Sequence, residues 1–315
     1  MSFSISVVIP VFNGERFIKK AINSAISQPE VSEIVVVNDG SIDNTLDIVE
    51  QMQQQYPVIK IYHHKNKLNK GRSASRNLGI TNATGHYIAF LDADDFYLDN
   101  RFKNDIEIFE NSVNIDGVYN AIGAFFYREP SNFEQNKLKL TTVSEPINPD
   151  DLFEALTSYK KGYFSIDGLT VKKSVFNTVG YFTESLQVAE DTEMIYKLAL
   201  KHQLKSGIID RPVAMRGVHD ANVFNNKKVY GTFTTKMFES LFVWANKEHI
   251  SVKKMDSLLN LLWIHKFKEE NGLLQYITYW FALFFNKPKY LFSILSIKYF
   301  PVIRLRKKLF PIIYK

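Results

Sequence analysis

The chain has 315 residues, of which 45% are hydrophobic and 23% charged, and this composition is typical of a globular protein with a sizeable buried core. The absence of cysteine excludes disulfides and thiolate metal sites, and it fits a cytosolic enzyme. We expect neither a signal peptide, because residues 1–4 lack a basic and apolar leader, nor a membrane span, because no apolar run is long enough.

The first hundred residues alternate between strand and helix patterns. Apolar, β-branched runs predict buried strands, and apolar residues at helical spacing predict helices. We expect strands at 5–10, 33–37, 58–62 and 86–91, and helices at 14–27, at 72–82 and from a cap at Ser41 or Asp43 to about 55. Strands separated by helices imply right-handed crossovers and an α/β fold with a mainly parallel sheet.

The alternation loosens after residue 100. In chain order we expect a helix at 99–110, a strand at 117–126, a flexible proline-containing excursion at 128–150, a short helix from 150, a helix at 169–178 with a turn at 179–182, and an amphipathic helix at 191–202. Residues 227–272 are predicted to be helical, and 273–315 form an aromatic and basic appendix.

The most informative motif is the acidic sequence Asp92-Ala93-Asp94-Asp95, which follows the buried run 86–91. A strand that ends in Asp-x-Asp places two carboxylates at the carboxyl edge of the sheet, where open α/β folds bind ligands. Hard oxygen ligands suit Mg²⁺ or Mn²⁺, and such a cation suits a diphosphate. Taken alone, such a motif is more often an acidic turn before a helix, and the motifs around it favour the functional interpretation.

Two further motifs have both a functional and a structural interpretation. Asp39 directly follows a strand, so it could accept a hydrogen bond from a base or a ribose, or it could simply form an Asx-turn with Gly40. The segment 69–77 opens a helix with a glycine and two arginines. Its N–H groups and Arg76 could hold phosphate oxygens, or the segment could be a solvated helix start.

Two motifs in the second half of the sequence are similarly open. Glu190-Asp191 lies at the start of a predicted helix, so it could cap the helix or supply a general base aimed at an acceptor hydroxyl. His219 could ligate a metal through an imidazole nitrogen, although a lone histidine in a polar loop is commonly a surface residue.

The C-terminal region carries the basic excess of the chain, whose net charge is +6. Residues 286–315 contain no acidic residue and the basic residues Lys287, Lys289, Lys298, Arg304, Arg306, Lys307, Lys308 and Lys315. Nucleic acid and an anionic membrane surface are both partners for such a tail, and the interleaved aromatic residues favour the membrane. The apolar run 276–285 is too short to span a bilayer, so it forms either a packed helix or an interfacial one.

Five stretches, in this order, resemble the family-2 glycosyltransferases, which have the Rossmann-like GT-A fold. They are Ser6–Asn13, Val36–Ser41, Asn69–Asn77, Gly85–Asp95, and Val179–Phe182 leading to Glu190-Asp191. The resemblance covers roughly residues 4–222. It implies a catalytic domain at 1–222, with a nucleotide-sugar half at about 1–98 and an acceptor half at about 99–222, followed by a helical extension at 223–315.

The resemblance also implies a role for each matching residue. Pro10, Val11 and Phe12 would line the base and ribose pocket, Asp39 would recognise the base, Asn69 and Arg76 would help to hold the nucleotide, and Asp92 would contact the ribose and the metal shell. Asp94 would bind Mn²⁺ or Mg²⁺, with His219 near the diphosphate. Asp191 would be the catalytic base, and Glu190 would support the acceptor site.

The function implied is that of an inverting, metal-dependent glycosyltransferase. It would move a sugar from a nucleotide-sugar, UDP-sugar by default, to a glycan or lipid-linked acceptor in bacterial cell-surface polysaccharide synthesis. We expect a cytoplasmic enzyme, peripheral on the inner face of the plasma membrane, with no nucleic-acid partner. The sequence does not predict its oligomeric state. The alternatives are a sugar-nucleotide nucleotidyltransferase, although only Gly14 stands where that class needs a glycine-rich loop, and a non-catalytic sugar-nucleotide-binding protein.

Overall fold

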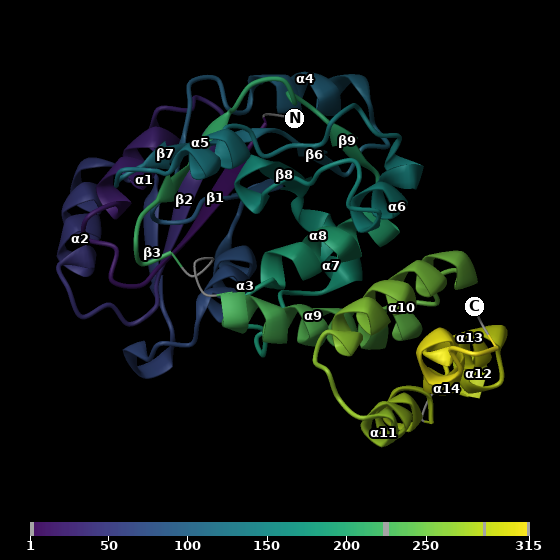
Figure 1. The fold of residues 1–315 in the computed structure, drawn as a ribbon. Helices are drawn as coiled ribbons and strands as arrows, with labels where there is room; N and C mark the ends of the chain where they lie inside the picture. Colours follow the sequence, from purple (N-terminus) through teal and green to yellow (C-terminus); the bar gives the residue numbers. More distant parts are fainter. Residues whose placement is uncertain (1–2, 223–226, 286–287, 314–315) are drawn as a thin grey trace. The chain divides into compact units, whose positions relative to one another are not determined.

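The structure, a computed structural model, describes residues 3–222, 227–285 and 288–313 (Figure 1). It divides into two compact units, Met1–Tyr230 and Gly231–Lys315, each of which is described separately below.

The first unit is built on a seven-stranded sheet with the strand order β3-β2-β1-β4-β8-β6-β9. Its strands are β1 (Ile5–Val11), β2 (Val31–Asn38), β3 (Ile59–His63), β4 (Tyr87–Phe90), β6 (Gly117–Tyr119), β8 (Leu169–Lys172) and β9 (Leu204–Ser206). Only β8 runs against its neighbours, β4 and β6. The predicted α/β fold with a mainly parallel sheet flanked by helices is therefore confirmed.

The helices α1 (Ile18–Ile26), α2 (Thr45–Gln55) and α3 (Arg72–Asn82) connect the first four strands. Side chains of alternate residues in β1 point to opposite faces of the sheet. Ile5, Val7, Ile9 and Val11 belong to a core cluster with the buried face of α1. On the other face α3 approaches so closely that a Cβ on Gly79 would collide with Val8.

The strand order reverses beside β1, because β2 follows it on one side and β4 lies on the other. The carboxyl ends of strands at such a switch point form a crevice where open α/β sheets bind ligands. Pro10 lies near this end, where β1 still pairs with β2 but its pairing with β4 has stopped at Val8. A residue without an N–H is tolerated at such an edge position.

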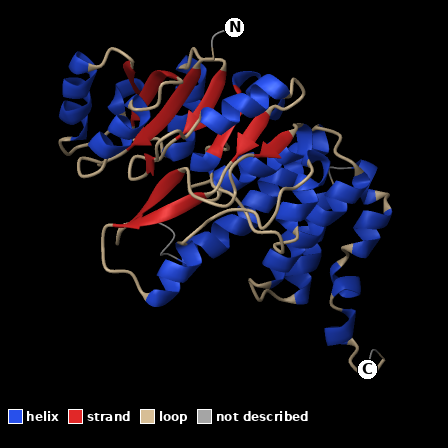
Figure 2. Ribbon diagram, turned by 90° about the horizontal axis from the view of Figure 1, so that it is seen from above, coloured by secondary structure: helices blue, strands red, loops and turns tan. Residues whose placement is uncertain are grey.

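A smaller sheet lies apart from the larger one (Figure 2). Its strands are β5 (Phe96–Tyr97), β7 (Ile122–Phe126) and β10 (Ala214–Val218). The central strand β10 is antiparallel to β5 and parallel to β7. Because β5 directly follows the acidic motif and β10 directly precedes His219, this sheet brings these two segments together.

Two expectations for residues 100–182 are wrong in part. The strand expected at 117–126 is two strands, β6 and β7, which belong to different sheets. The helix expected at 169–178 begins as strand β8, continues as a 3₁₀ turn (Lys173–Val175) and ends as the short helix α7 (Phe176–Val179). Periodicity cannot separate a short buried strand from a helix segment, which explains the second error.

The excursion at 128–150 contains the helix α5 (Asn132–Leu138), which has a capping box between Ser131 and Glu134. The S-x-x-E pattern of that box is a sequence signal for the start of a helix. The remaining helices of the first unit are α4 (Lys103–Asn111), α6 (Leu152–Thr157) and α8 (Glu190–Lys201), with 3₁₀ turns at Lys65–Lys67, Pro149–Asp151 and Ile166–Gly168.

The second unit is helical, as expected. It contains most of α9 (Lys227–Lys247), together with α10 (Val252–Phe267), α11 (Leu273–Phe284) and the short helices α12 (Pro288–Leu291), α13 (Ile294–Lys298), α14 (Pro301–Arg304) and α15 (Arg306–Leu309). Trp263 of α10 is fully buried and packs edge-on against Tyr276 and Tyr279 of α11. Among the described residues of the whole chain, no helix has the length and apolar character needed to cross a bilayer.

Candidate active site

The loop after β4 sends its three carboxylates to different partners. The N–H of Asp95 bonds the carbonyl oxygen of Asp92 at 3.0 Å, so the loop is a tight turn. The Asp95 side chain is buried and accepts a hydrogen bond from the N–H of Gly217 at 2.8 Å, which fixes β10 to the loop. Asp94 instead reaches the far end of β10, where its Oδ2 lies 3.0 Å from His219 Nε2 and 3.0 Å from Asn222 Nδ2.

Arg76 of α3 joins the acidic loop to the start of α8. Its Nη2 donates to Asp92 Oδ1 at 2.6 Å, and its Nη1 donates to Glu190 Oε1 at 2.7 Å. Burial by itself lowers the pKa of Arg76, but Asp92, Glu190 and Asp191 outweigh it and raise the pKa above its ordinary value. Residues from three distant stretches of the sequence therefore form one ionic network.

Asp191 lies in this same electrostatic environment. Its carboxylate also helps to raise the pKa of Arg216, against the effect of burial and together with the larger effects of Asp95 and Asp167. Asp191 is the second residue of α8 and is only partly buried, and its Oδ1 accepts from the N–H of Thr192 at 2.7 Å. The residue before the helix, Ala189, has a left-handed φ of 64°, which turns the chain into α8 at this point.

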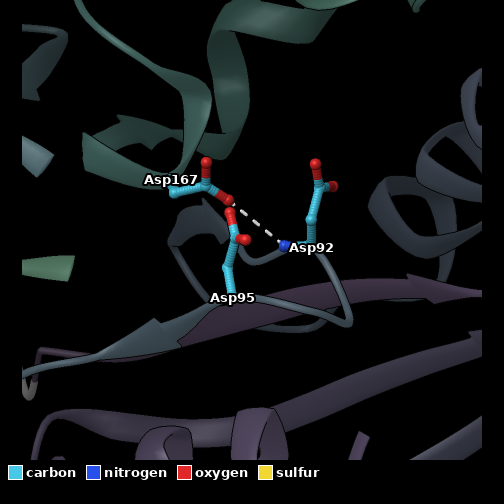
Figure 3. A group of neighbouring side chains, drawn as sticks. All are labelled: Asp92, Asp95 and Asp167. Atoms are coloured by element: carbon cyan, nitrogen blue, oxygen red, sulfur yellow. Dashed lines mark hydrogen bonds between the residues drawn. The ribbon is translucent and has the colours of Figure 1, made fainter. Parts of the chain in front are cut away.

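Two carboxylates of the loop form an acidic cluster with Asp167, which lies in the 3₁₀ turn before β8. Asp92, Asp95 and Asp167 each offer a ligand atom within 4.8 Å of the others, and Figure 3 shows the carboxylates of Asp95 and Asp167 facing one another. The N–H of Asp92 donates to Asp167 Oδ1 at 3.2 Å. Burial and the neighbouring charge of Asp167 raise the pKa of Asp95 well above its usual range. Arg216 offsets part of this charge.

Exposure separates the acidic residues of the site into two classes. The side chains of Asp92 and Asp94 are 33% and 27% exposed, and Asp191 is also partly exposed. Asp95, Asp167 and Glu190 are almost completely buried. The first class can contact a ligand, whereas the second class can act only through its neighbours.

The pKa values of the accessible pair in the acidic loop move in opposite directions. Burial raises the pKa of Asp92, but Arg76 and Arg72 outweigh it, so the pKa falls below its ordinary value. Burial and the charge of Asp92 raise the pKa of Asp94 in spite of His219. Asp94 lies in a region of excess negative charge, which favours a bound cation.

The residues expected around the base and ribose have mixed positions. Pro10 and Val11 are buried in the strand, whereas the side chain of Phe12 is 51% exposed. Asp39 is buried, and its two carboxylate oxygens accept hydrogen bonds from the N–H groups of Lys70 (2.6 Å) and Gly71 (2.9 Å). Asp39 therefore holds the loop that contains Asn69, which is itself exposed.

Sequence reasoning missed Asp167, Arg216 and Asn222. Asp167 lies in a 3₁₀ turn before β8 and has no motif around it. Arg216 is part of β10, and its Nη2 donates to Ser165 at 3.0 Å. Only Asn222 had a usable signal, because His219 and Asn222 are three residues apart in one polar loop, and the N–H of His219 bonds Asn222 Oδ1 at 2.6 Å.

Comparison with known proteins explains the arrangement of these motifs. The family model described as Glycosyl transferase family 2 matches residues 6–182, which is more than half of the chain. The chain belongs to glycosyl transferase family 2. This family membership makes it a transferase and agrees with the resemblance found in the sequence.

Several curated relatives carry related descriptions. An uncharacterized glycosyltransferase of Rickettsia typhi is 30% identical over 70% of this chain and 66% of its own length. GgaA of Bacillus subtilis, a minor teichoic acid biosynthesis protein, is 25% identical over 71% of this chain and 50% of its own length. The first three relatives are covered over 31%, 66% and 31% of their length, so the chain spans one to two thirds of them.

The fold of the chain is similar to that of solved structures of Staphylococcus aureus TarS. TarS 1–349 in complex with UDP-GlcNAc has a TM-score of 0.66 and 18% identity, and the match covers 97% of this chain and 92% of that one. A second structure, TarS 1–349 in complex with UDP, has a TM-score of 0.62. This likeness supports the GT-A fold of the chain.

Proposed function

We propose that this chain is an inverting, divalent-metal-dependent glycosyltransferase. It transfers a sugar from a nucleotide-sugar, with a UDP-sugar as the default donor, to a hydroxyl of a glycan or lipid-linked acceptor in cell-surface polysaccharide synthesis. The observation that carries this proposal is the Arg76 bridge, because it brings the helix start with Asp191 beside the accessible Asp92 and Asp94.

Asp191 is proposed as the catalytic base. It is partly exposed and lies in the first turn of α8. The acceptor oxygen attacks the anomeric carbon from the face opposite the diphosphate, while its proton passes to Asp191. The anomeric C–O bond breaks and the nucleoside diphosphate leaves with the electron pair. One displacement inverts the anomeric centre, so no protein nucleophile is required.

A divalent cation fits the residues at the edge of this site. Asp94 offers a carboxylate and His219 an imidazole nitrogen, both partly exposed and 3.0 Å apart, with the amide of Asn222 beside them. These are ligand types that Mn²⁺ accepts, and Mg²⁺ favours the oxygen ligands. Asp94 and His219 would hold the cation. When bound, such a cation stabilises negative charge on a leaving diphosphate.

The names of the relatives support the donor and the pathway. Two TarS structures are complexes with UDP and UDP-GlcNAc, and GgaA is described as a teichoic acid biosynthesis protein. We extend this to the present chain as a proposal that the donor is a UDP-sugar and that the product is a cell-surface polymer. The exposed Phe12 and the loop held by Asp39 would then receive the nucleoside.

We propose in addition that the second unit attaches the enzyme to an anionic membrane surface from the cytoplasmic side. The segment after α12 exposes Phe292, Ile294 and Ile297 to 86%, 74% and 62%, and no acidic residue occurs after residue 285. Each basic residue near an anionic headgroup contributes about 1 kcal/mol. Lys287 and Lys315, which the sequence analysis counted, lie outside the described residues.

Nucleotide release from a panel of sugar nucleotides, with and without Mn²⁺, tests the transferase proposal. We expect one donor, most simply a UDP-sugar, to release nucleoside diphosphate in a reaction that chelation of the metal abolishes. Pyrophosphate formed from a nucleoside triphosphate and a sugar phosphate would instead identify a nucleotidyltransferase. Tight binding of a donor with no release against any offered acceptor would favour the non-catalytic alternative.

A further inference from the structure

The resemblance gives Arg76 a place in nucleotide binding, but its surroundings suit a different role. Arg76 is only 1% exposed, although arginine is among the residues least often buried. Each of its two Nη atoms already donates to a carboxylate, and its remaining Nε is buried without a hydrogen-bond partner among the described residues. Little of this guanidinium is therefore open to a phosphate.

The carboxylates that Arg76 joins belong to different parts of the catalytic machinery. Asp92 is in the accessible acidic loop, and Glu190 is the first residue of α8, directly before the proposed base. A guanidinium is planar and rigid, so two hydrogen bonds to two carboxylates fix their mutual position. The Cζ atom of Arg76 also lies over the ring of Phe182, 5.4 Å from its centre, and Phe182 belongs to the segment that leads to α8.

The same helix contacts that segment at two more places. Asn77 pairs with the backbone of Phe182 in both directions, since its Oδ1 accepts from the N–H at 2.8 Å and its Nδ2 donates to the carbonyl at 3.0 Å. Ser73 donates to the carbonyl of Leu186 at 3.2 Å. Three residues of α3 therefore bind this segment: Asn77 contacts residue 182, Ser73 contacts residue 186 and Arg76 contacts residue 190.

The segment held in this way contains a strained position. Ala189 adopts a left-handed φ of 64°, a conformation that costs a non-glycine residue roughly 1–2 kcal/mol. Such a conformation persists only where surrounding contacts fix it. The three contacts from α3 lie before and after Ala189, so they supply the required restraint.

We infer that α3, through Ser73, Arg76 and Asn77, is the template that positions the base-bearing start of α8 against the acidic loop. Arg76 is then a positioning residue, and Glu190 acts by receiving Arg76 instead of touching the acceptor. This inference rests on the proposed function for the identity of the base, but the contacts themselves are independent of it.

The test compares Arg76→Met, Arg76→Lys and Asn77→Ala with Lys161→Met, which removes a surface ion pair far from these residues in sequence. We expect Arg76→Met to lower kcat about a hundredfold or more, because it removes the hydrogen-bonded partner of buried Glu190 and leaves only the longer contact with Arg72 at 3.6 Å, while UDP affinity changes by less than about threefold. Arg76→Lys should restore only part of kcat, because an ammonium cannot reproduce the planar bridge. Asn77→Ala should lower kcat about tenfold with unchanged UDP affinity.

Amide hydrogen exchange gives a readout that needs no substrate. Arg76→Met and Asn77→Ala should both raise exchange across residues 182–191, and Arg76→Met should also raise it at 92–95, whereas Lys161→Met should do neither. Unchanged exchange in these segments would overturn the inference. So would a loss of UDP affinity above about tenfold with kcat preserved at saturating donor, since that pattern belongs to a nucleotide ligand.

Asn77→Ala decides the question if Arg76→Met does not fold. A wild-type protein that binds no nucleotide and releases none from any donor would refute the proposed function, but exchange at 182–191 would still report on the template. The two failures are therefore distinguishable.

Discussion

Asp94 and His219 face each other at the edge of the site, and both remain partly exposed. Asp95, the next residue in the chain, is buried and binds the backbone of β10 instead. Neighbouring carboxylates in one loop thus have different tasks, and burial distinguishes them. In the proposed mechanism the metal-binding role belongs to Asp94, whereas Asp95 holds the loop to the smaller sheet.

Replacing Asp94 with Asn should remove the stimulation of turnover by Mn²⁺. Losing a ligand to a cation that stabilises the leaving diphosphate costs several kcal/mol, which is on the order of a hundredfold or more in rate. Nucleotide release measured against Mn²⁺ concentration checks this. Asp150→Asn, which changes an exposed carboxylate near Gln203, is the control and should respond to Mn²⁺ like the wild type. Equal Mn²⁺ stimulation in both variants would exclude Asp94 as a ligand.

At the scale of elements, the contact between α3 and β1 sets the position of the template helix. Gly79 lies on the face of α3 that meets Val8, and an added Cβ would collide with the Val8 side chain. The absence of a side chain at this position is therefore what allows the helix to approach the sheet.

Gly79→Ala should destabilise the protein although alanine is the better helix former. Overpacking costs about 1–3 kcal/mol, which exceeds the roughly 1 kcal/mol gained in helix propensity. A lowered melting temperature in thermal unfolding is the expected result. Gly231→Ala in α9 is the matched control, because nothing lies within 4 Å of its added Cβ, and it should leave the melting temperature unchanged or raise it. A raised melting temperature for Gly79→Ala would contradict the close approach.

The elements that could be predicted from sequence are those with strong local patterns. The apolar runs of β1, β2 and β4 and the apolar spacing of α1 place the first strands of the sheet and the acidic loop correctly. Strand β8 was missed because a four-residue buried run has no distinguishing period. Asp167 and Arg216 were missed because tertiary contacts alone bring them beneath the acidic loop, and no local sequence signal marks them.

At the scale of the whole molecule, the second unit shows which residues of the apolar run 276–285 are packed and which are exposed. Tyr276, Trp280, Leu283 and Phe284 of α11 are buried inside the unit, so this part of the run is packed core. Further exposed apolar residues occur between positions 292 and 313, where Lys307 and Lys308 are also exposed. Lys298, by contrast, pairs with Asp256 and contributes less positive charge.

Membrane attachment is best tested with point variants, since removing 273–315 would uncover Trp263 of the core. The triple variant Phe292→Ser, Ile294→Ser and Ile297→Ser should weaken binding to vesicles that contain anionic lipid by about tenfold or more, because it removes the exposed apolar anchors. Vesicle flotation measures this, with neutral vesicles as the comparison. Binding of the triple variant equal to the wild type would exclude these helices as the anchor, and wild-type self-association without vesicle binding would point to a protein interface.

The turnover of Asp191→Asn tests the central claim most directly. The substitution keeps the size of the side chain but removes the carboxylate that is proposed to take the acceptor's proton. We predict that sugar transfer falls to a trace of the wild-type rate while UDP binds as tightly as before. If Asp191→Asn retains most of its turnover at saturating donor and acceptor, the base lies elsewhere and the proposed mechanism is wrong.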